Sequence, residues 1–253
     1  MSKTIIVTGA SRGLGLACAR ILLDKFNCNV VTISRSMTEE LQGLKKEFNG
    51  RIEVVQGDVT SLEDQKAALD KAVTTFGGLD GLVLNAGVAA PQLRIENMVI
   101  ERMRKLFDIN FFSLVSMLQI SIPHLRKTKG TVIFTSSGAA TGNTTSWAAY
   151  NGSKAALNAL CRTLAAEEPE ITAVALRPGV VDTPMQTELI AEAKGQMSDK
   201  DYQRFVDIHE QKKLVPPEYS GHVLAALAVK ADKGLSGQFV NYSDESMSAY
   251  QPS

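Results

Sequence analysis

The chain has 253 residues, 44% of them hydrophobic, which is enough to bury the core of one α/β domain. Its 27 Lys and Arg residues balance its 27 Asp and Glu residues, and no basic block occurs, so we expect no nucleic-acid partner. The N-terminal apolar run is too short for a signal sequence, and no later segment is expected to approach the length of a membrane-spanning helix. We therefore predict a cytoplasmic protein.

Short β-branched runs alternate with longer helical patterns along the whole chain. The predicted strands are Thr4–Val7, Val30–Ile33, Ile52–Val55, Leu82–Leu84, Thr131–Phe134, Ala173–Leu176 and Phe239–Asn241. The predicted helices lie near Leu14–Phe26, Thr38–Phe48, Leu62–Phe76, Ile100–Leu125, Ala148–Glu167 and Pro217–Val229. Connections of this length cross over, so the strands should be parallel. This pattern predicts one domain over residues 1–253, a Rossmann-type doubly wound sheet of about seven strands with helices on both faces.

A glycine-rich turn joins the first predicted strand to the first predicted helix. Glycines in such a turn permit positive φ and let the backbone approach a pyrophosphate, whose negative charge the helix N-terminus favours. No Gly-Lys-Ser/Thr follows at the distance that a nucleoside-triphosphate loop needs, which leaves a turn without ligand as the simpler alternative. We predict a dinucleotide site that uses Gly9, Ser11, Arg12, Gly13, Leu14 and Gly15.

The end of the second strand predicts which dinucleotide binds. Sites for NAD usually carry an acidic residue there, but this strand ends in Ser34 and Arg35. A guanidinium suits a 2′-phosphate, and Arg12 could hold the same group from the other side. Either arginine alone could be merely solvated. Together they predict NADP(H) as the cofactor.

Two further loops follow strands at the edge where ligands gather in such sheets. Asp58 and Val59 follow the third strand and are placed to reach the adenine, and Asn85, Ala86 and Gly87 end the fourth. Each could equally be an ordinary turn former.

Tyr150 and Lys154 are four residues apart and therefore share one face of a helix. An ammonium about 4 Å from the phenol oxygen would favour the phenolate by up to about 3 pK units, which would poise the tyrosine for proton exchange. Ser137 lies upstream at the end of the fifth strand. Its neighbour Ser136 points the opposite way, because side chains alternate along a strand, and is predicted to satisfy backbone groups only.

These residues in this order resemble the classical short-chain dehydrogenase/reductase family over nearly the whole chain. The matching positions are Thr8, Gly9, Gly13, Gly15, Asn85, Ala86, Gly87, Asn110, Ser137, Tyr150, Lys154, Pro178 and Gly179. The resemblance implies that Tyr150 donates the proton, that Ser137 holds the substrate carbonyl, and that Lys154 binds the nicotinamide ribose and lowers the tyrosine pKa. It also implies that Asn110 holds a relay water, and that the nicotinamide carboxamide meets Pro178, Gly179, Val180 and Thr183.

Three segments, Glu167–Glu170, Pro178–Gln186 and Gly237–Glu245, are similar to the sepiapterin reductase branch of that family, especially to its fungal and bacterial benzil reductase relatives. This similarity implies an NADPH-dependent reductase of bulky or aromatic ketones and diketones. A pterin reductase, with Asp244 anchoring the pterin, is one alternative, and a non-catalytic NADP(H)-sensing protein is another. The family also implies a homodimer or homotetramer, in which the helices near Ile100–Leu125 and Ala148–Glu167 pair between subunits.

The remaining polar residues predict a segment that covers the substrate site, and they do not predict a metal site. Residues Thr183–Val215 are polar and interrupted, and we expect them to form a mobile cover over the substrate. The three histidines, His124, His209 and His222, lack the spacing of zinc ligands. Cys18, Cys28 and Cys161 are expected to be reduced packing residues.

Overall fold

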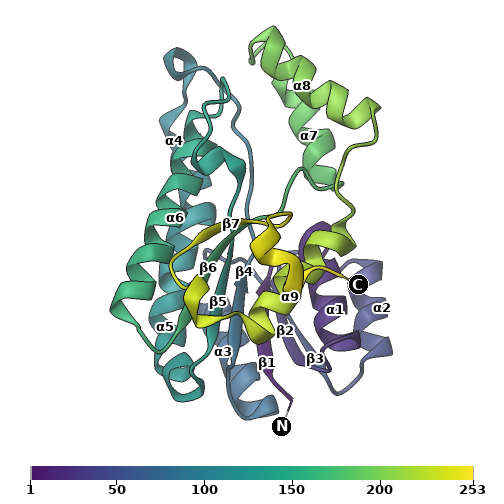
Figure 1. Cartoon of the computed structure of the whole chain (residues 1–253), viewed down its shortest axis with the longest axis vertical. Coiled ribbons are helices and arrows are strands. Elements are labelled where there is room, and N and C mark those ends of the chain that lie inside the picture. Colours follow the sequence, from purple (N-terminus) through teal and green to yellow (C-terminus); the bar gives the residue numbers. More distant parts are fainter. Residues whose placement is uncertain (1, 253) are drawn as a thin grey trace.

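One parallel sheet forms the centre of the computed structural model, which describes residues 2–252 (Figure 1). Its seven strands within those residues run in the order β3-β2-β1-β4-β5-β6-β7. Their bounds are β1 Thr4–Thr8, β2 Asn29–Ser34, β3 Ile52–Gln56, β4 Gly81–Leu84, β5 Thr131–Thr135, β6 Thr172–Arg177 and β7 Phe239–Asn241. Each predicted strand is confirmed to within one residue at either end, and the predicted Rossmann-type fold is confirmed.

Apolar layers cover both faces of the sheet, which explains why the strands are continuous apolar runs rather than alternating ones. The helices α1 Gly13–Asp24, α2 Glu39–Glu47 and α9 Pro217–Lys230 contribute buried residues to one layer. The helices α3 Leu62–Phe76, α5 Ser113–Thr128 and α6 Ala148–Glu167 contribute to the other. Short 3-10 turns lie at Ile95–Asn97, Gly138–Ala140, Lys233–Leu235 and Glu245–Tyr250.

The helix boundaries follow from local capping. Helix α3 begins after Ser61, whose hydroxyl accepts a hydrogen bond from Asp64 N, and ends at Gly77, which has φ +88°. These two caps coincide with the predicted bounds of this helix.

The predicted helix near Ile100–Leu125 is two helices joined by a π-helical turn. Helix α4 Ile100–Phe107 runs through the turn Asp108–Phe112 directly into α5. The joined segment Ile100–Thr128 is long and apolar enough to cross a membrane by length and composition, so the expectation that no segment reaches that length is wrong. This segment nevertheless packs against the sheet, as the core helix of a globular domain does, through the buried side chains of Leu114, Met117, Leu118 and Leu125.

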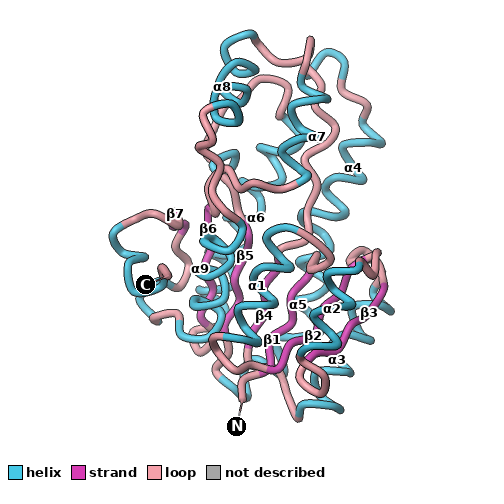
Figure 2. Tube along the Cα trace, turned by 90° about the vertical axis from the view of Figure 1, so that its right-hand side faces the viewer, coloured by secondary structure: helices cyan, strands magenta, loops and turns pink. Residues whose placement is uncertain are grey.

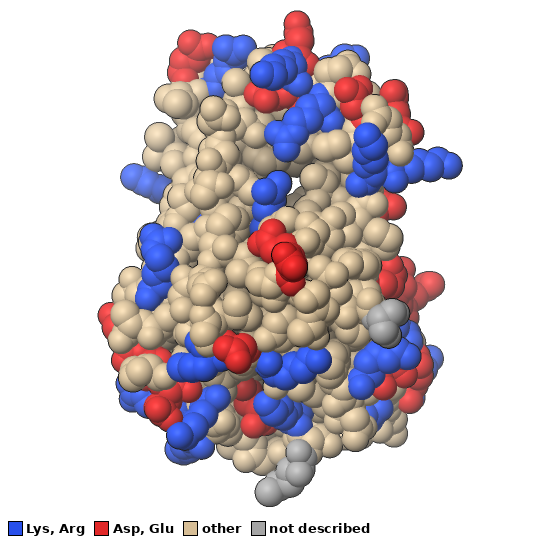
Figure 3. Space-filling model, viewed as in Figure 1, with Lys and Arg blue, Asp and Glu red and all other residues tan. Residues whose placement is uncertain are grey.

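The segment predicted as a cover contains two helices that sequence reading missed, α7 Pro184–Ala193 and α8 Asp199–Glu210. They stand above the carboxyl ends of the strands in both ribbon views (Figures 1 and 2). A parallel bridge between Val181 and Val215 joins the base of this segment. Below, "the lid" means residues 183–215. Lys and Arg residues are intermingled with Asp and Glu on the face of the molecule shown in Figure 3.

Candidate active site

The glycine turn packs closely against the loop that follows β4. Gly9 has φ +70° and Gly13 has φ +55°, conformations that glycine adopts at little cost. A Cβ atom at Gly9 would lie 2.9 Å from Ala86 Cα, and one at Gly15 would overlap the carbonyl oxygen of Gly9. At the other side of the turn, a Cβ on Gly13 would lie 3.0 Å from Thr183 Cγ2 of the lid. The close packing therefore leaves no room for a side chain at Gly9 or Gly15.

Side chains from neighbouring elements hold this turn in place. The hydroxyl of Thr8 accepts hydrogen bonds from Asn85 N and Ala86 N, each at 2.9 Å. The amide of Asn85 in turn donates to the carbonyl oxygens of Thr8 at 3.0 Å and Gly9 at 3.2 Å. Thr38, the N-cap of α2, donates to the carbonyl oxygen of Ser11 at 2.7 Å. Leu14 is buried in the core layer beneath.

The two candidate phosphate-binding arginines lie in different surroundings. Arg35 is exposed at the end of β2, and the buried Ser34 before it donates to the carbonyl oxygen of Ser36 at 3.3 Å. Arg12 forms an exposed ion pair with Glu188 of the lid at 3.2 Å. A phosphate bound by Arg12 would therefore compete with the Glu188 carboxylate.

Asp58 is engaged in its own turn. One carboxylate oxygen accepts from both the backbone N and the hydroxyl of Thr60 at 2.8 Å, as in an ordinary turn-forming Asp. The carbonyl oxygen of the adjacent Val59 accepts from the Gln65 amide.

Lys154 and Asn110 come together below the loop after β4. Lys154 Nζ donates to the carbonyl oxygen of Thr135 at 2.8 Å, and a Cβ on Gly87 would lie 3.7 Å from that ammonium. Asn110 lies in the π-helical turn, and its amide both accepts from Val88 N and donates to Val88 O at 2.8 Å. The irregular turn therefore places a buried amide beside the lysine.

Tyr150 lies at the start of α6, near the Ser137 hydroxyl. Burial raises the pKa of Tyr150 and outweighs the influence of the nearby Ser137 hydroxyl, which lowers it. The Lys154 ammonium is 5.7 Å from the centre of the tyrosine ring, and burial lowers the pKa of this lysine to about 8. The structure thus differs from the expectation of a lowered tyrosine pKa, because desolvation is the largest influence on both groups.

The two adjacent serines have different environments. Ser136 is buried and donates to Asn158 Oδ1 at 2.6 Å, whereas Ser137 accepts from Ala139 N at 3.1 Å and faces Tyr150. The structure therefore brings Ser137, and not Ser136, to the tyrosine.

Replacing each serine by alanine should show which hydroxyl acts on the substrate and which one only stabilises the fold. We expect Ser137→Ala to lower kcat/KM of the reaction at this site by about 10²-fold or more, because a hydrogen-bond donor beside Tyr150 is lost. Ser136→Ala should lower only the stability, by about 1 kcal/mol, because it removes one buried hydrogen bond. Steady-state kinetics and urea unfolding of both variants would test this, and loss of activity in Ser136→Ala alone would reverse the assignment.

The loop after β6 closes the other side of the site. Gly179 has φ +83°, and a Cβ there would lie 2.6 Å from Tyr242 Cε1. The carbonyl oxygens of Pro178 and Val180 accept from Ser220 Oγ at 2.6 Å and Val215 N at 2.8 Å. This loop thus leads directly into Thr183 and the lid.

Sequence reading did not anticipate the apolar and polar contacts between the lid and the rest of the site. Asp201 of α8 accepts from the backbone N of Thr145 at 2.9 Å, from its hydroxyl at 2.6 Å, and from the Ser198 hydroxyl at 3.0 Å. Hydrogen bonds from the Thr145 hydroxyl and backbone, and from Ser198, lower the pKa of Asp201. The lid is thereby tied to the loop between Ser137 and Tyr150.

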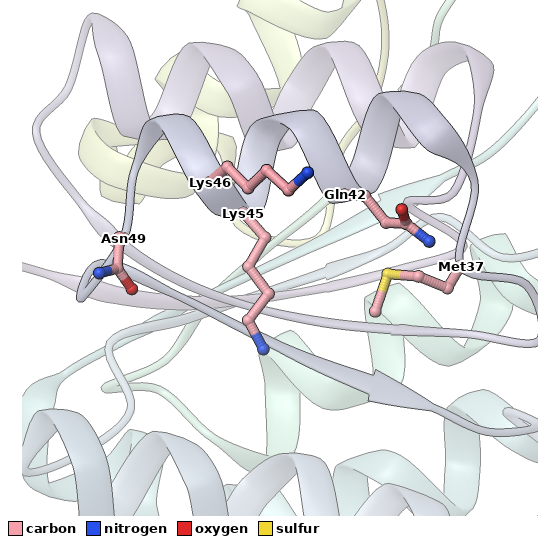
Figure 4. A pocket seen from close by; sticks show the side chains of 5 residues that line it. All are labelled: Met37, Gln42, Lys45, Lys46 and Asn49. Atoms are coloured by element: carbon pink, nitrogen blue, oxygen red, sulfur yellow. The ribbon is translucent and has the colours of Figure 1, made fainter.

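A surface hollow of about 470 Å³ lies beside α2, away from these catalytic side chains. It is lined by Met37, Gln42, Lys45, Lys46 and Asn49 (Figure 4). The hollow contains neither Tyr150 nor Ser137, so it is not the reaction site.

A parallel Rossmann-type sheet that brings a serine, a tyrosine and a buried lysine together at its carboxyl edge is the arrangement of an oxidoreductase site. The chain belongs to the short chain dehydrogenase family, whose sequence model matches residues 3–194. An uncharacterized oxidoreductase of Schizosaccharomyces pombe is 45% identical over 241 residues, which cover 95% of this chain and 96% of that protein. Benzil reductase ((S)-benzoin forming) of Saccharomyces cerevisiae is 36% identical, covering 99% of this chain and 100% of that protein. A crystal structure of a short chain dehydrogenase/reductase from Saccharomyces cerevisiae has a TM-score of 0.96 at 37% identity, covering 99% of this chain and 100% of that one.

Proposed function

We propose that the protein is an NADPH-dependent carbonyl reductase of bulky or aromatic ketones and diketones. The observation that carries this proposal is the placement of Ser137 near Tyr150, with the buried Lys154 against the tyrosine ring. Reduction of a carbonyl develops negative charge on its oxygen, and two hydroxyls aimed at one point can stabilise that charge.

The proposed chemistry divides between the cofactor and three side chains. When bound, the reduced nicotinamide supplies the hydride. Ser137 donates a hydrogen bond to the carbonyl oxygen and fixes its position. Tyr150, whose pKa is raised by burial, stays protonated near neutral pH and transfers its proton to that oxygen. The Lys154 ammonium stabilises the phenolate that remains.

The residues around the glycine turn fit a dinucleotide. Gly9 and Gly13 adopt positive φ, and Gly9 and Gly15 have no room for a side chain, so the backbone N–H groups of the turn and the N-terminus of α1 can hold a pyrophosphate. Arg35 and Arg12 would hold the 2′-phosphate, and Asp58 and Val59 would contact the adenine. Lys154 would bind the nicotinamide ribose, and Pro178, Gly179, Val180 and Thr183 would contact the carboxamide.

Arg35 provides a direct test of the preference for the phosphorylated cofactor. We expect Arg35→Asp to change the NADPH/NADH ratio of kcat/KM toward NADH by about 10²-fold, because an ion pair with the 2′-phosphate is replaced by repulsion. Steady-state kinetics with both cofactors would measure this ratio. Arg51→Asp, at a half-buried arginine just before β3, is the control for nonspecific charge effects, and an unchanged ratio in Arg35→Asp would remove Arg35 from the site.

Two observations favour an aromatic ketone over a pterin. The yeast benzil reductase resembles this chain over its full length, and Tyr150 packs against an apolar cluster. The Asp244 carboxylate accepts from Asn241 N at 2.7 Å and so serves its own turn, which weakens the case for a pterin anchor.

A substrate screen would test the proposed function. Purified protein with NADPH should reduce benzil and related aryl diketones faster than sepiapterin or simple aldehydes. Oxidation of alcohols with NADP⁺ in the absence of any carbonyl reduction would contradict the proposal. Binding of NADPH without turnover of any carbonyl would favour a sensing protein instead.

A further inference from the structure

A third apolar cluster lies apart from the two layers that cover the sheet. Its buried members are Ala89, Ala139, Trp147, Leu189, Ala193, Met197 and Phe205, and the partly buried side chains of Tyr150, Met185, Ile190 and Tyr202 pack against it. The loop after β4, the start of α6 and both lid helices contribute to it. The proton donor of the proposed reaction therefore lies at the border of an apolar cluster that the main core does not require.

Trp147 is the member of this cluster that links Tyr150 to the lid. Its ring centre is 5.3 Å from that of Tyr150 at an interplanar angle of 83°, and 5.2 Å from that of Phe205 at 34°. The indole is only 7% exposed, and Trp147 precedes Tyr150 by one helical turn. It thus lies on the rigid scaffold beside the proton donor, whereas Phe205 belongs to the lid.

A buried amide fixes the orientation of the indole. Gln92, 4% exposed, accepts a hydrogen bond from Trp147 Nε1 at 3.4 Å and donates one to the carbonyl oxygen of Leu189 at 3.3 Å. One side chain of the loop after β4 therefore connects α6 with lid helix α7. A buried amide with both ends engaged restricts the rotation of its partners, since breaking either bond leaves a buried polar group unsatisfied.

We infer that Trp147, oriented by Gln92, is the specificity-determining residue that packs against an aryl substituent of the substrate. A carbonyl held by Ser137 and Tyr150 must direct one substituent toward the side chains that border the phenol, and those side chains form this cluster. A phenyl ring there can pack edge-to-face against the indole, as Tyr150 itself does, whereas a methyl group gains little from that surface. The inference rests on the proposed function and names the substrate feature that the site selects.

The kinetic test compares two diketones that share the reacting group. Benzil carries two phenyl groups and 2,3-butanedione carries two methyl groups, so the ratio of their kcat/KM values isolates the contribution of the rings. We expect Trp147→Leu to lower the benzil/butanedione ratio about tenfold. Gln92→Met keeps the side-chain volume but removes both hydrogen bonds, so it should lower the same ratio less, mainly through a higher KM for benzil. Phe48→Leu, at the partly buried aromatic residue that caps the C-terminus of α2, controls for general effects of losing a ring.

Trp147 is the single tryptophan of the chain, so its fluorescence reports on the site without any turnover. With the protein saturated with NADP⁺, benzil should change the emission saturably and 2,3-butanedione should not. Equal losses for both diketones in Trp147→Leu would overturn the inference, as would an unchanged ratio, or emission that benzil does not alter. If the protein reduced no carbonyl yet benzil still changed the emission saturably, the proposed function would fail while the aryl contact stood.

Discussion

Replacing Tyr150 by Phe is expected to lower kcat for carbonyl reduction by about 10²–10⁴-fold, the usual contribution of a positioned general acid. The phenyl ring keeps the packing against Trp147, since only the hydroxyl is removed. The variant should therefore fold normally and bind NADPH with a Kd within about twofold of the unaltered protein. Stopped-flow or steady-state assays with benzil, together with a fluorescence titration of NADPH, would measure both quantities.

Tyr250→Phe is the matched control for this change. The hydroxyl of the buried Tyr250 accepts a hydrogen bond from Asp232 N at 2.9 Å, in the C-terminal segment and away from Ser137. Its loss should lower stability by about 1 kcal/mol without altering kcat. Full activity in Tyr150→Phe would show that another group supplies the proton, and the mechanism proposed above would have to be abandoned.

Adding one methyl group at Gly15 should have the second largest effect. A Cβ there would overlap the carbonyl oxygen of Gly9 and lie 2.6 Å from Asn85 Nδ2. Both neighbours belong to the network that fixes the glycine turn, so neither can move without breaking hydrogen bonds. We expect Gly15→Ala to reduce the free energy of unfolding by about 1–3 kcal/mol and to weaken NADPH binding at least about tenfold.

Gly43 provides a control, because alanine there should change the free energy of unfolding in the opposite direction. Gly43 lies in the exposed part of α2, where an added Cβ would meet no atom within 4 Å. Gly43→Ala should therefore raise the free energy of unfolding by up to about 1 kcal/mol, because alanine favours the helix, and leave cofactor binding unchanged. Urea unfolding and NADPH titrations of the two variants would test the pair. If Gly15→Ala bound NADPH as tightly as Gly43→Ala, the close packing of the turn would have no role in binding.

The sheet could be predicted from sequence because its strands are buried on both faces. Runs such as Thr4–Val7 and Thr131–Phe134 are short, apolar and β-branched, and turn residues bound them. Helices α3 and α6 were predicted with their observed bounds because their patterns are long and periodic. The glycine turn and the serine, tyrosine and lysine of the site were recognisable because each needs a fixed residue type at a fixed spacing.

The lid could not be predicted in the same way. Helices α7 and α8 are short and flank Gly195, so their pattern looks like an interrupted loop. Their position depends on contacts between residues far apart in sequence, such as Arg12 with Glu188 and Gln92 with Leu189. Local periodicity contains no information about such pairs, which explains why the apolar cluster around Trp147 was missed.

The pKa shifts of Tyr150 and Lys154 could not be predicted from their spacing in the sequence. The i, i+4 relation of Tyr150 and Lys154 was correct, but desolvation of each group depends on everything packed around it. Burial raises the pKa of the tyrosine and lowers that of the lysine, which sequence spacing alone does not indicate.

The carboxylate of Asp201 connects α8 to the loop that precedes α6. One oxygen of this carboxylate accepts three hydrogen bonds from Thr145 and Ser198. The N-terminus of α8 therefore cannot move outward without breaking its contacts with the loop that leads to Tyr150. Helix α7 has fewer polar contacts, an exposed ion pair at Glu188 and one amide contact at Leu189, and it is otherwise held by the apolar packing of Leu189 and Ala193. We therefore expect a bulky substrate to enter by displacement of α7, while α8 stays in place.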